Sequence, residues 1–87
     1  MKVILSPKAE KQLKKLGKID QIAIARKIRG IARKNIAKQK KLKGFKNIFR
    51  LRIGDYRLVY KKTKNELYIV LIGHRRDVYK VIKRFFR

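Results

Sequence analysis

The chain has 87 residues, a length that suits one domain with a modest core. It contains no cysteine, which excludes disulfides and thiolate metal sites, and its longest apolar run, residues 68–72, is too short to cross a membrane. The net charge is +23, from 28 Lys+Arg against 5 Asp+Glu. A surface whose charges serve only solubility usually carries matching acidic residues, and these are nearly absent here. The charge therefore favours an anionic partner, either nucleic acid or an acidic protein.

The first half of the chain predicts one strand and two helices. Residues 2–5 form a short apolar strand, after which Ser6 and Pro7 supply a helix N-cap and a first helical residue. Gly17 ends this helix, and Asp20 is expected to cap the next one. The second helix carries apolar residues at helical spacing, and the lysine-rich residues 34–46 that follow predict a loop or a frayed helix end. The residues of that apolar face are Ile24, Ile28 and Ile31.

The second half of the chain predicts three strands and a helix. Residues 48–53 and 56–61 alternate apolar with basic side chains as two hairpin strands, and residues 66–73 form a central strand. Residues 77–86 form a short amphipathic helix. The expected fold is therefore α+β with the order β-α-α-β-β-β-α, a single domain over residues 1–87. It is a small curved antiparallel sheet with an N-terminal helical pair on one face and a short C-terminal helix.

The predicted hairpin gathers arginines on one face of the sheet. A two-residue Gly54-Asp55 turn sets Ile53 opposite Tyr56, so that Arg52 faces Arg57 and Arg50 faces Val59. Facing residues share a side of the sheet, as do residues two apart along a strand. Like charges opposed in this way destabilise a sheet, so the arginines indicate an anion that they bind. Their side holds Arg50, Arg52 and Arg57, and the other side holds Phe49, Leu51, Ile53, Tyr56, Leu58 and Tyr60.

The side-chain inventory limits the chemistry that the chain can perform. The carboxylates are isolated from one another in the sequence, which argues against a metal site, and we expect no cofactor. His74 is the only histidine, which excludes a two-histidine nuclease, and Ser6, the only serine, is assigned as a cap. Cleavage of a phosphodiester would therefore depend on positioning and on arginines that stabilise the pentacoordinate phosphate. The five carboxylates belong to Glu10, Asp20, Asp55, Glu66 and Asp77.

A basic segment with one tyrosine, residues 74–79, follows the third strand directly. Strand alternation places His74 on the same face as Val70 and Ile72, where it could border the arginines. Basic residues interleaved with tyrosine suit base stacking beside phosphate contacts. An equally tenable interpretation makes His74 and Arg75 surface residues that close the sheet, with Tyr79 half-buried on an amphipathic helix.

FRLRIGDYRLVYK, followed by an apolar strand and IGHRRDVYK, resembles the RelE-type toxins of toxin–antitoxin pairs. The resemblance spans nearly the whole chain, including SPKAEKQLKKL near its start and LKG before the hairpin. It implies a type II toxin that cleaves mRNA in the ribosomal A site, by attack of the ribose 2′-OH that leaves a 2′,3′-cyclic phosphate. It also implies mRNA and the ribosome as partners. The absence of cysteine fits a cytoplasmic location, and we expect no membrane partner because the apolar residues are used in strands and short helices. The charge of +23 favours control by an acidic RelB-like antitoxin.

The same resemblance assigns site residues by position. Arg50 and Arg52 take the places of two basic residues on the first hairpin strand, Arg57 and Arg75 would clamp the phosphate, and Tyr79 would stack on or orient the base. Well-known members of the RelE-type family carry lysine at the positions of Arg50 and Arg52. Arginine stays protonated, so Arg52 is a poor general base, and either Tyr79 or His74 takes the proton or the activity is electrostatic and slow. The expected RNA contacts are Arg50, Arg52, Lys61, His74, Arg76 and Lys43.

Two other functions remain open from the sequence. ParE-like relatives poison DNA gyrase through protein contacts and need no catalytic cluster, whereas the arginines and the HRRDVY segment favour the nuclease. The charge alone also permits a basic protein that binds RNA or the ribosome without catalysis.

Overall fold

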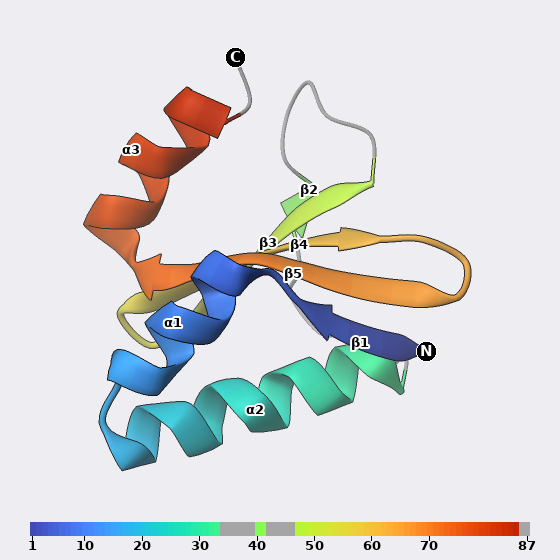
Figure 1. The fold of residues 1–87 in the computed structure, drawn as a ribbon, viewed down its shortest axis with the longest axis horizontal. Coiled ribbons are helices and arrows are strands. Elements are labelled where there is room, and N and C mark those ends of the chain that lie inside the picture. The colour runs from blue at the N-terminus through green and yellow to red at the C-terminus, as the bar shows by residue number, and fades with distance from the viewer. Residues whose placement is uncertain (34–39, 42–46, 86–87) are drawn as a thin grey trace.

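The computed structural model describes residues 1–33, 40–41 and 47–85, which form one sheet with helices on both faces (Figure 1). The strands lie in the order β1-β5-β4-β3-β2. This arrangement confirms the predicted α+β fold. The elements are β1 (Lys2–Leu5), α1 (Pro7–Lys15), α2 (Lys18–Ala32), β2 (Lys40–Lys41), β3 (Ile48–Ile53), β4 (Tyr56–Lys62), β5 (Glu66–His74) and α3 (Arg75–Phe85).

The sheet is mixed, whereas the sequence predicted antiparallel pairing throughout. β5 pairs antiparallel with β4 on one side and parallel with β1 on the other, which confirms that it is an interior strand. The parallel pair is possible because two helices and the hairpin separate β1 from β5, which is long enough for a crossover. Within the loop expected at residues 34–46, the two residues of β2 pair with β3, and the remainder of that loop lies outside the described residues.

The hairpin has the predicted register. Ile53 pairs with Tyr56, Arg52 with Arg57 and Arg50 with Val59. Gly54, at the first central position of the turn, has a φ of 59°, which a residue without a Cβ adopts at little cost. The turn residues therefore fix which side chains share each face of the sheet.

The helical pair covers one face of the sheet. Ile24, Ile28 and Ile31 of α2 and Ala9 of α1 are buried against the apolar face of the sheet, and Figure 1 shows α2 running along this face. Burial of such side chains is the main stabilising contribution to a small domain. The buried sheet residues that they cover are Leu51, Leu58, Tyr60, Leu67, Ile69 and Ile72.

The third helix, α3, packs on the opposite face. Its Val78 and Ile82 form a second buried cluster with Ile48, Val59 and Leu71 of the sheet. In Figure 1, α3 rises on the side of the sheet opposite α2. The helix also starts two residues earlier than predicted, at Arg75 rather than at residue 77. Both faces of the central strands are thus buried, as the apolar composition of β5 predicted.

A β-bulge between β4 and β5 changes which residues share a face. Val59 pairs with Leu71 but Tyr60 pairs with Ile69, so Val70 is an extra residue on β5. Val70 packs with the α3 cluster, while Ile72 belongs to the core under the helical pair. The prediction that Val70, Ile72 and His74 share one face is therefore wrong, because strict alternation does not hold across a bulge.

Helices α1 and α2 are capped in different ways at their N-termini. Ser6 caps α1 as predicted, since its Oγ accepts a hydrogen bond from the Ala9 amide at 2.9 Å. The same hydroxyl donates to the Val70 carbonyl of β5 at 2.8 Å. By contrast, α2 is capped by Gly17 without a side-chain hydrogen bond, and Asp20, the predicted cap, lies in its first turn. A carboxylate there still interacts favourably with the helix dipole.

We expect Ser6→Ala to lower the free energy of unfolding by about 1–2 kcal/mol. The variant removes the cap of α1 and leaves the Val70 carbonyl without its donor at a site that is only 7 % exposed. Urea denaturation followed by circular dichroism measures the change. Gly17→Ser is the matched control, because it adds a cap at a position where an added Cβ contacts nothing within 4 Å. It should be neutral or slightly stabilising, and equal losses in both variants would contradict the capping role of Ser6.

Candidate functional site

The predicted arginine cluster forms on the face of the sheet that carries α3. Arg52 and Arg57 are register partners, and Arg50 lies opposite Val59, whose side chain is buried under α3. Arg52 is exposed, whereas Arg50 and Arg57 are half-buried. The Arg57 guanidinium donates to the Tyr56 carbonyl at 3.1 Å, which restricts its conformations. The hairpin therefore holds three cations on one small area of sheet.

Helix α3 brings Tyr79 to this cluster. The Arg50 guanidinium donates a hydrogen bond to the Tyr79 hydroxyl, and its Cζ lies 5.5 Å from the centre of the Tyr79 ring. A cation over an aromatic face is a favourable contact. Tyr79 is 40 % exposed, so its ring remains accessible beside Arg50. The structure thus joins two predicted site residues that are 29 positions apart in the sequence.

The start of α3 is tied to the hairpin turn. The Arg75 amide donates to the Asp55 carbonyl at 3.0 Å, so Arg75 enters the helix beside the turn that separates Arg52 from Arg57. Gly73 pairs with Arg57 in the sheet, and a Cβ there would lie 3.3 Å from a Val78 methyl group. The absence of a side chain at Gly73 therefore allows α3 to approach the arginine face closely.

No carboxylate within the described part of the chain forms an ion pair with Arg50, Arg52 or Arg57. The Glu10–Lys14 ion pair (3.3 Å) lies on α1. Among the described residues there is also no group of three or more His, Cys, Asp or Glu side chains that could hold a metal ion. A cluster of cations that no described carboxylate neutralises, next to an accessible tyrosine, is suited to an anion such as a phosphate.

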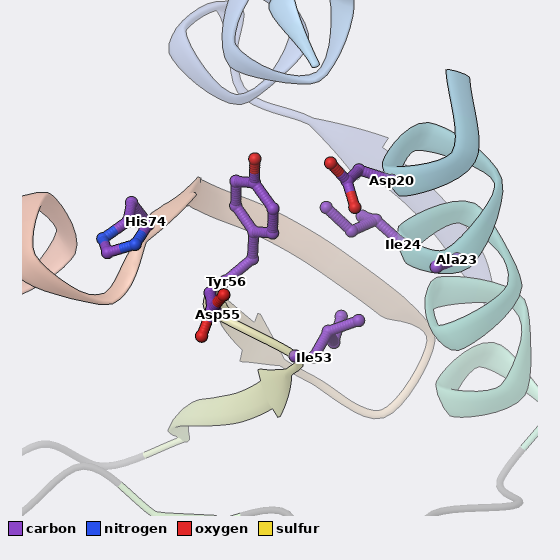
Figure 2. A pocket seen from close by; sticks show the side chains of 8 residues that line it. Asp20, Ala23, Ile24, Ile53, Asp55, Tyr56 and His74 are labelled. Carbon is purple, nitrogen blue, oxygen red and sulfur yellow. The ribbon is translucent and has the colours of Figure 1, made fainter. Parts of the chain in front are cut away.

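His74 lies away from the arginine cluster, contrary to the prediction that it borders them. It is the register partner of Tyr56, and the two rings meet edge to face with centroids 6.2 Å apart. Both line a pocket of about 390 Å³ that also includes Asp20 and Asp55, and Figure 2 shows His74 and Asp20 on either side of Tyr56. The negative charge of Asp20 is the main cause that raises the pKa of Tyr56, with smaller effects of burial and Asp55.

The other predicted RNA contacts are dispersed. Lys61 is the register partner of Ile48, so it shares the arginine face but lies toward the opposite end of the hairpin. Arg76 is exposed in the first turn of α3, where its amide lies 3.4 Å from His74 Nδ1. Lys43 lies outside the described residues.

Two contacts that organise the site were not predicted from the sequence. One is the Arg50–Tyr79 contact, and the other is the hydrogen bond that Gln12 of α1 accepts from the Ile72 amide at 2.8 Å. The second contact anchors β5 just past its bulge. A glutamine within an otherwise lysine-rich helix was the available signal for it, but no spacing rule could have identified its partner 60 residues away.

Comparisons with known proteins place the chain in a defined structural group. Residues 3–79 match the family described as the ParE toxin of the type II toxin–antitoxin system parDE. A search of curated proteins found no match. No helix in the described ranges is long and apolar enough to span a membrane.

Solved structures of toxins share the fold along most of their length. The isolated RelE toxin of E. coli is 23% identical, with a TM-score of 0.75 and 98% of each chain covered. A chain of the RelBE2 toxin–antitoxin complex from Mycobacterium tuberculosis is 26% identical (TM-score 0.71, 85% of this chain and 96% of that one). A chain of the RelB–RelE antitoxin–toxin complex from Methanococcus jannaschii is 23% identical (TM-score 0.74, 90% and 96%).

We expect Arg52→Gln to increase the free energy of unfolding by a few tenths of a kcal/mol, because it relieves the repulsion between facing arginines. The gain should shrink as sodium chloride is raised from low to high concentration, since salt screens the repulsion. Urea denaturation at several salt concentrations measures both effects. Arg26→Gln on the exposed surface of α2 is the matched control for net charge. An equal gain from the control variant would show that overall charge, not the facing pair, is responsible.

Proposed function

The chain belongs to the ParE toxin family within the RelE/ParE superfamily of type II toxin–antitoxin systems, and we propose that it is a metal-independent, ribosome-dependent mRNA endoribonuclease that inhibits translation in the cytoplasm. One observation carries the proposal. Arg52 faces Arg57 on the hairpin, and Arg50 holds Tyr79 beside them, which is the arrangement of groups that a phosphate flanked by a base requires. A toxin that acted only through protein contacts would not need such a cluster.

In the proposed reaction the arginines stabilise charge that develops on the phosphate. The ribose 2′-oxygen attacks the adjacent phosphorus and the bond to the 5′-oxygen breaks. The departing 5′-oxygen takes a proton from solvent, which leaves a 2′,3′-cyclic phosphate and a 5′-hydroxyl. Arg57 and Arg75 contact the nonbridging oxygens or the departing oxygen, where preorganised donors act most strongly in the transition state. Arg50 and Arg52 bind and orient the strand, and no metal ion is needed for this stabilisation.

The residue that accepts the 2′-hydroxyl proton is proposed to be Tyr79 in its phenolate form, which becomes the neutral phenol in this step. Arg50 and Arg52 cannot serve because a guanidinium stays protonated at working pH. His74 is turned toward Tyr56 on the other side of the sheet. Tyr79 is accessible, contacts Arg50 and can also stack on or orient the substrate base. If the proton instead leaves to water, catalysis is purely electrostatic and slower.

A second candidate function is inhibition of DNA gyrase. The observation that favours it is the family match itself, because ParE-type relatives poison gyrase through protein contacts. This function predicts that the arginine cluster is dispensable while exposed surfaces elsewhere are required. The two functions, and simple RNA binding without catalysis, therefore differ in which variants lose toxicity.

An acidic, RelB-like antitoxin is proposed as the partner that controls the toxin. The related structures from Methanococcus jannaschii and Mycobacterium tuberculosis are antitoxin–toxin complexes. A net charge of +23, and an arginine face that no carboxylate of the described residues neutralises, favour an extended acidic segment, because such segments cover large surfaces as they fold.

We expect Arg57→Ala and Arg75→Ala each to reduce cleavage by about 10²–10³-fold, since each removes a preorganised donor to a charged transition state. In-vitro translation with added protein, followed by mapping of mRNA 3′ ends, measures the rate. Arg26→Ala removes the same charge from α2 and should cleave like the wild type.

The outcomes of that assay separate the candidate functions. Ribosome-dependent cuts that disappear in both variants support the nuclease. Intact mRNA together with blocked gyrase supports the second candidate, and intact mRNA with unaffected gyrase leaves only RNA binding. Full toxicity in both variants, with normal folding, would overturn the assignment of Arg57 and Arg75.

We further expect co-expression with an acidic antitoxin to restore growth, and the complex to weaken as salt rises beyond about 0.15 M, where the Debye length is about 8 Å. Isothermal titration calorimetry at increasing sodium chloride measures the affinity. Protection of the arginines from a guanidine-modifying reagent in the complex reports whether they are covered. A salt-independent complex that leaves Arg50, Arg52 and Arg57 modifiable would contradict this account of control.

A further inference from the structure

Tyr68 is an accessible aromatic side chain on the arginine face of the sheet. It is 37 % exposed, and it is the register partner of Lys61 on β4 and of Ile4 on β1. Lys61 in turn pairs with Ile48, which lies on the same side of β3 as Arg50 and Arg52. Tyr68 and the arginine cluster therefore lie on the same face of the sheet, with α3 packed on the buried residues between them.

Tyr68 lines two hollows on the surface of the protein. The larger, of about 550 Å³, is lined mainly by apolar side chains, including Ile48, Val70 and Leu71. The smaller, of about 330 Å³, is lined by Ile4, Thr63 and Glu66. Tyr68 and Lys61 are the two residues that line both hollows. An exposed aromatic ring that borders two hollows, with a cation among the residues that line them, can bind a stacked base and a neighbouring phosphate.

The charges around the two hollows favour a polyanionic strand. Lys61 is exposed, and Lys8 also lines the larger hollow. Glu66, in the smaller hollow, is the one acid among the residues that line them, and a carboxylate can accept a hydrogen bond from an exocyclic amino group of a base. An apolar peptide would fill the larger hollow but would make no use of Lys61 and the exposed Tyr68, which line both hollows.

The position of Tyr68 relative to the arginines suits a continuous strand. Along β3, Ile48 and Arg52 are four residues apart, which corresponds to roughly 13 Å. Tyr68 lies two strands farther across the sheet, about 10 Å from Ile48 at the usual strand spacing, so a single-stranded RNA whose reacting phosphate lies at the arginines can reach it within a few nucleotides if it passes around α3.

We propose that Tyr68 and Lys61 form an accessory site that binds single-stranded RNA outside the reacting nucleotides, with bases stacked on the Tyr68 ring and a phosphate next to Lys61. The identity of this strand as a continuation of the cleaved mRNA rests on the proposed function. The binding itself does not require cleavage. The accessory site would contribute affinity and would favour substrates that are unpaired on one side of the cut.

The test uses the full chain and a 2′-O-methyl RNA about twelve nucleotides long, which cannot be cleaved by 2′-OH attack and is within the range that small single-strand binding domains cover. The RNA carries 2-aminopurine, whose fluorescence falls when it stacks on an aromatic ring. Fluorescence anisotropy gives Kd. We expect Tyr68→Leu to weaken binding about tenfold and to abolish the 2-aminopurine quenching, whereas Tyr68→Phe keeps both near the wild-type values.

A salt titration separates stacking from charge. Tyr68→Leu should leave the slope of log K against log salt unchanged, whereas Lys61→Ala should reduce it by about 0.7, the contribution of one phosphate contact on a single strand. Ile22→Ala, on the exposed part of α2, is the control for removal of a surface apolar side chain. Circular dichroism and urea denaturation verify that each variant is folded.

Unchanged Kd and unchanged quenching in folded Tyr68→Leu would overturn the accessory site, whether or not the ribosome assay finds cleavage. If the same variant instead fails to bind the antitoxin, the hollows accept a protein segment and the proposal is equally wrong. If Tyr68→Leu loses RNA binding and the wild-type protein does not cleave mRNA on the ribosome, the accessory site is supported and the proposed nuclease activity is contradicted. The two proposals can therefore fail separately.

Discussion

The register of the β3–β4 hairpin is the constraint on which the other features depend. Because side chains alternate across a strand, the Gly54-Asp55 turn assigns every residue of the hairpin to a face. A slip by one residue would turn the arginines into the core and the apolar residues toward solvent. The burial of Leu51 and Leu58 under the helical pair thus stabilises the same register that presents Arg52 and Arg57 to an anion.

The arginine face combines function with a local cost in stability. Facing arginines repel each other, and the described carboxylates do not neutralise them. The fold tolerates this because the central strands are buried on both sides, by the helical pair and by Val78 and Ile82 of α3. An anionic substrate or an acidic partner would relieve the repulsion, so binding and folding stability are linked. This linkage is expected where a site is built for a ligand rather than for stability.

Helix α3 connects the core to the candidate site. The Arg75 amide is bound to the hairpin turn, the apolar side of the helix packs on Val59 and Leu71, and Tyr79 contacts Arg50 one turn later. Its close approach depends on Gly73, where a larger residue would displace Val78. Any ligand or partner that moves α3 would therefore also move Tyr79 away from Arg50. The bulge at Val70 completes the arrangement, because it directs His74 to Tyr56 and leaves the arginine face without a histidine.

The sequence by itself determined the order of the elements, the hairpin turn, the arginine face and the cap at Ser6. Each of these follows from local rules, namely side-chain alternation, glycine at a positive φ, and a hydroxyl that reaches an amide three residues later. The tertiary structure alone decided the parallel pairing of β1 with β5, the face of His74 and the contact between Arg50 and Tyr79. These depend on how segments 18 to 64 residues apart pack against one another, and on a bulge whose extra residue no pattern in β5 marks. Local rules fix backbone conformation over a few residues, whereas the meeting of distant side chains is fixed by the burial of the core as a whole.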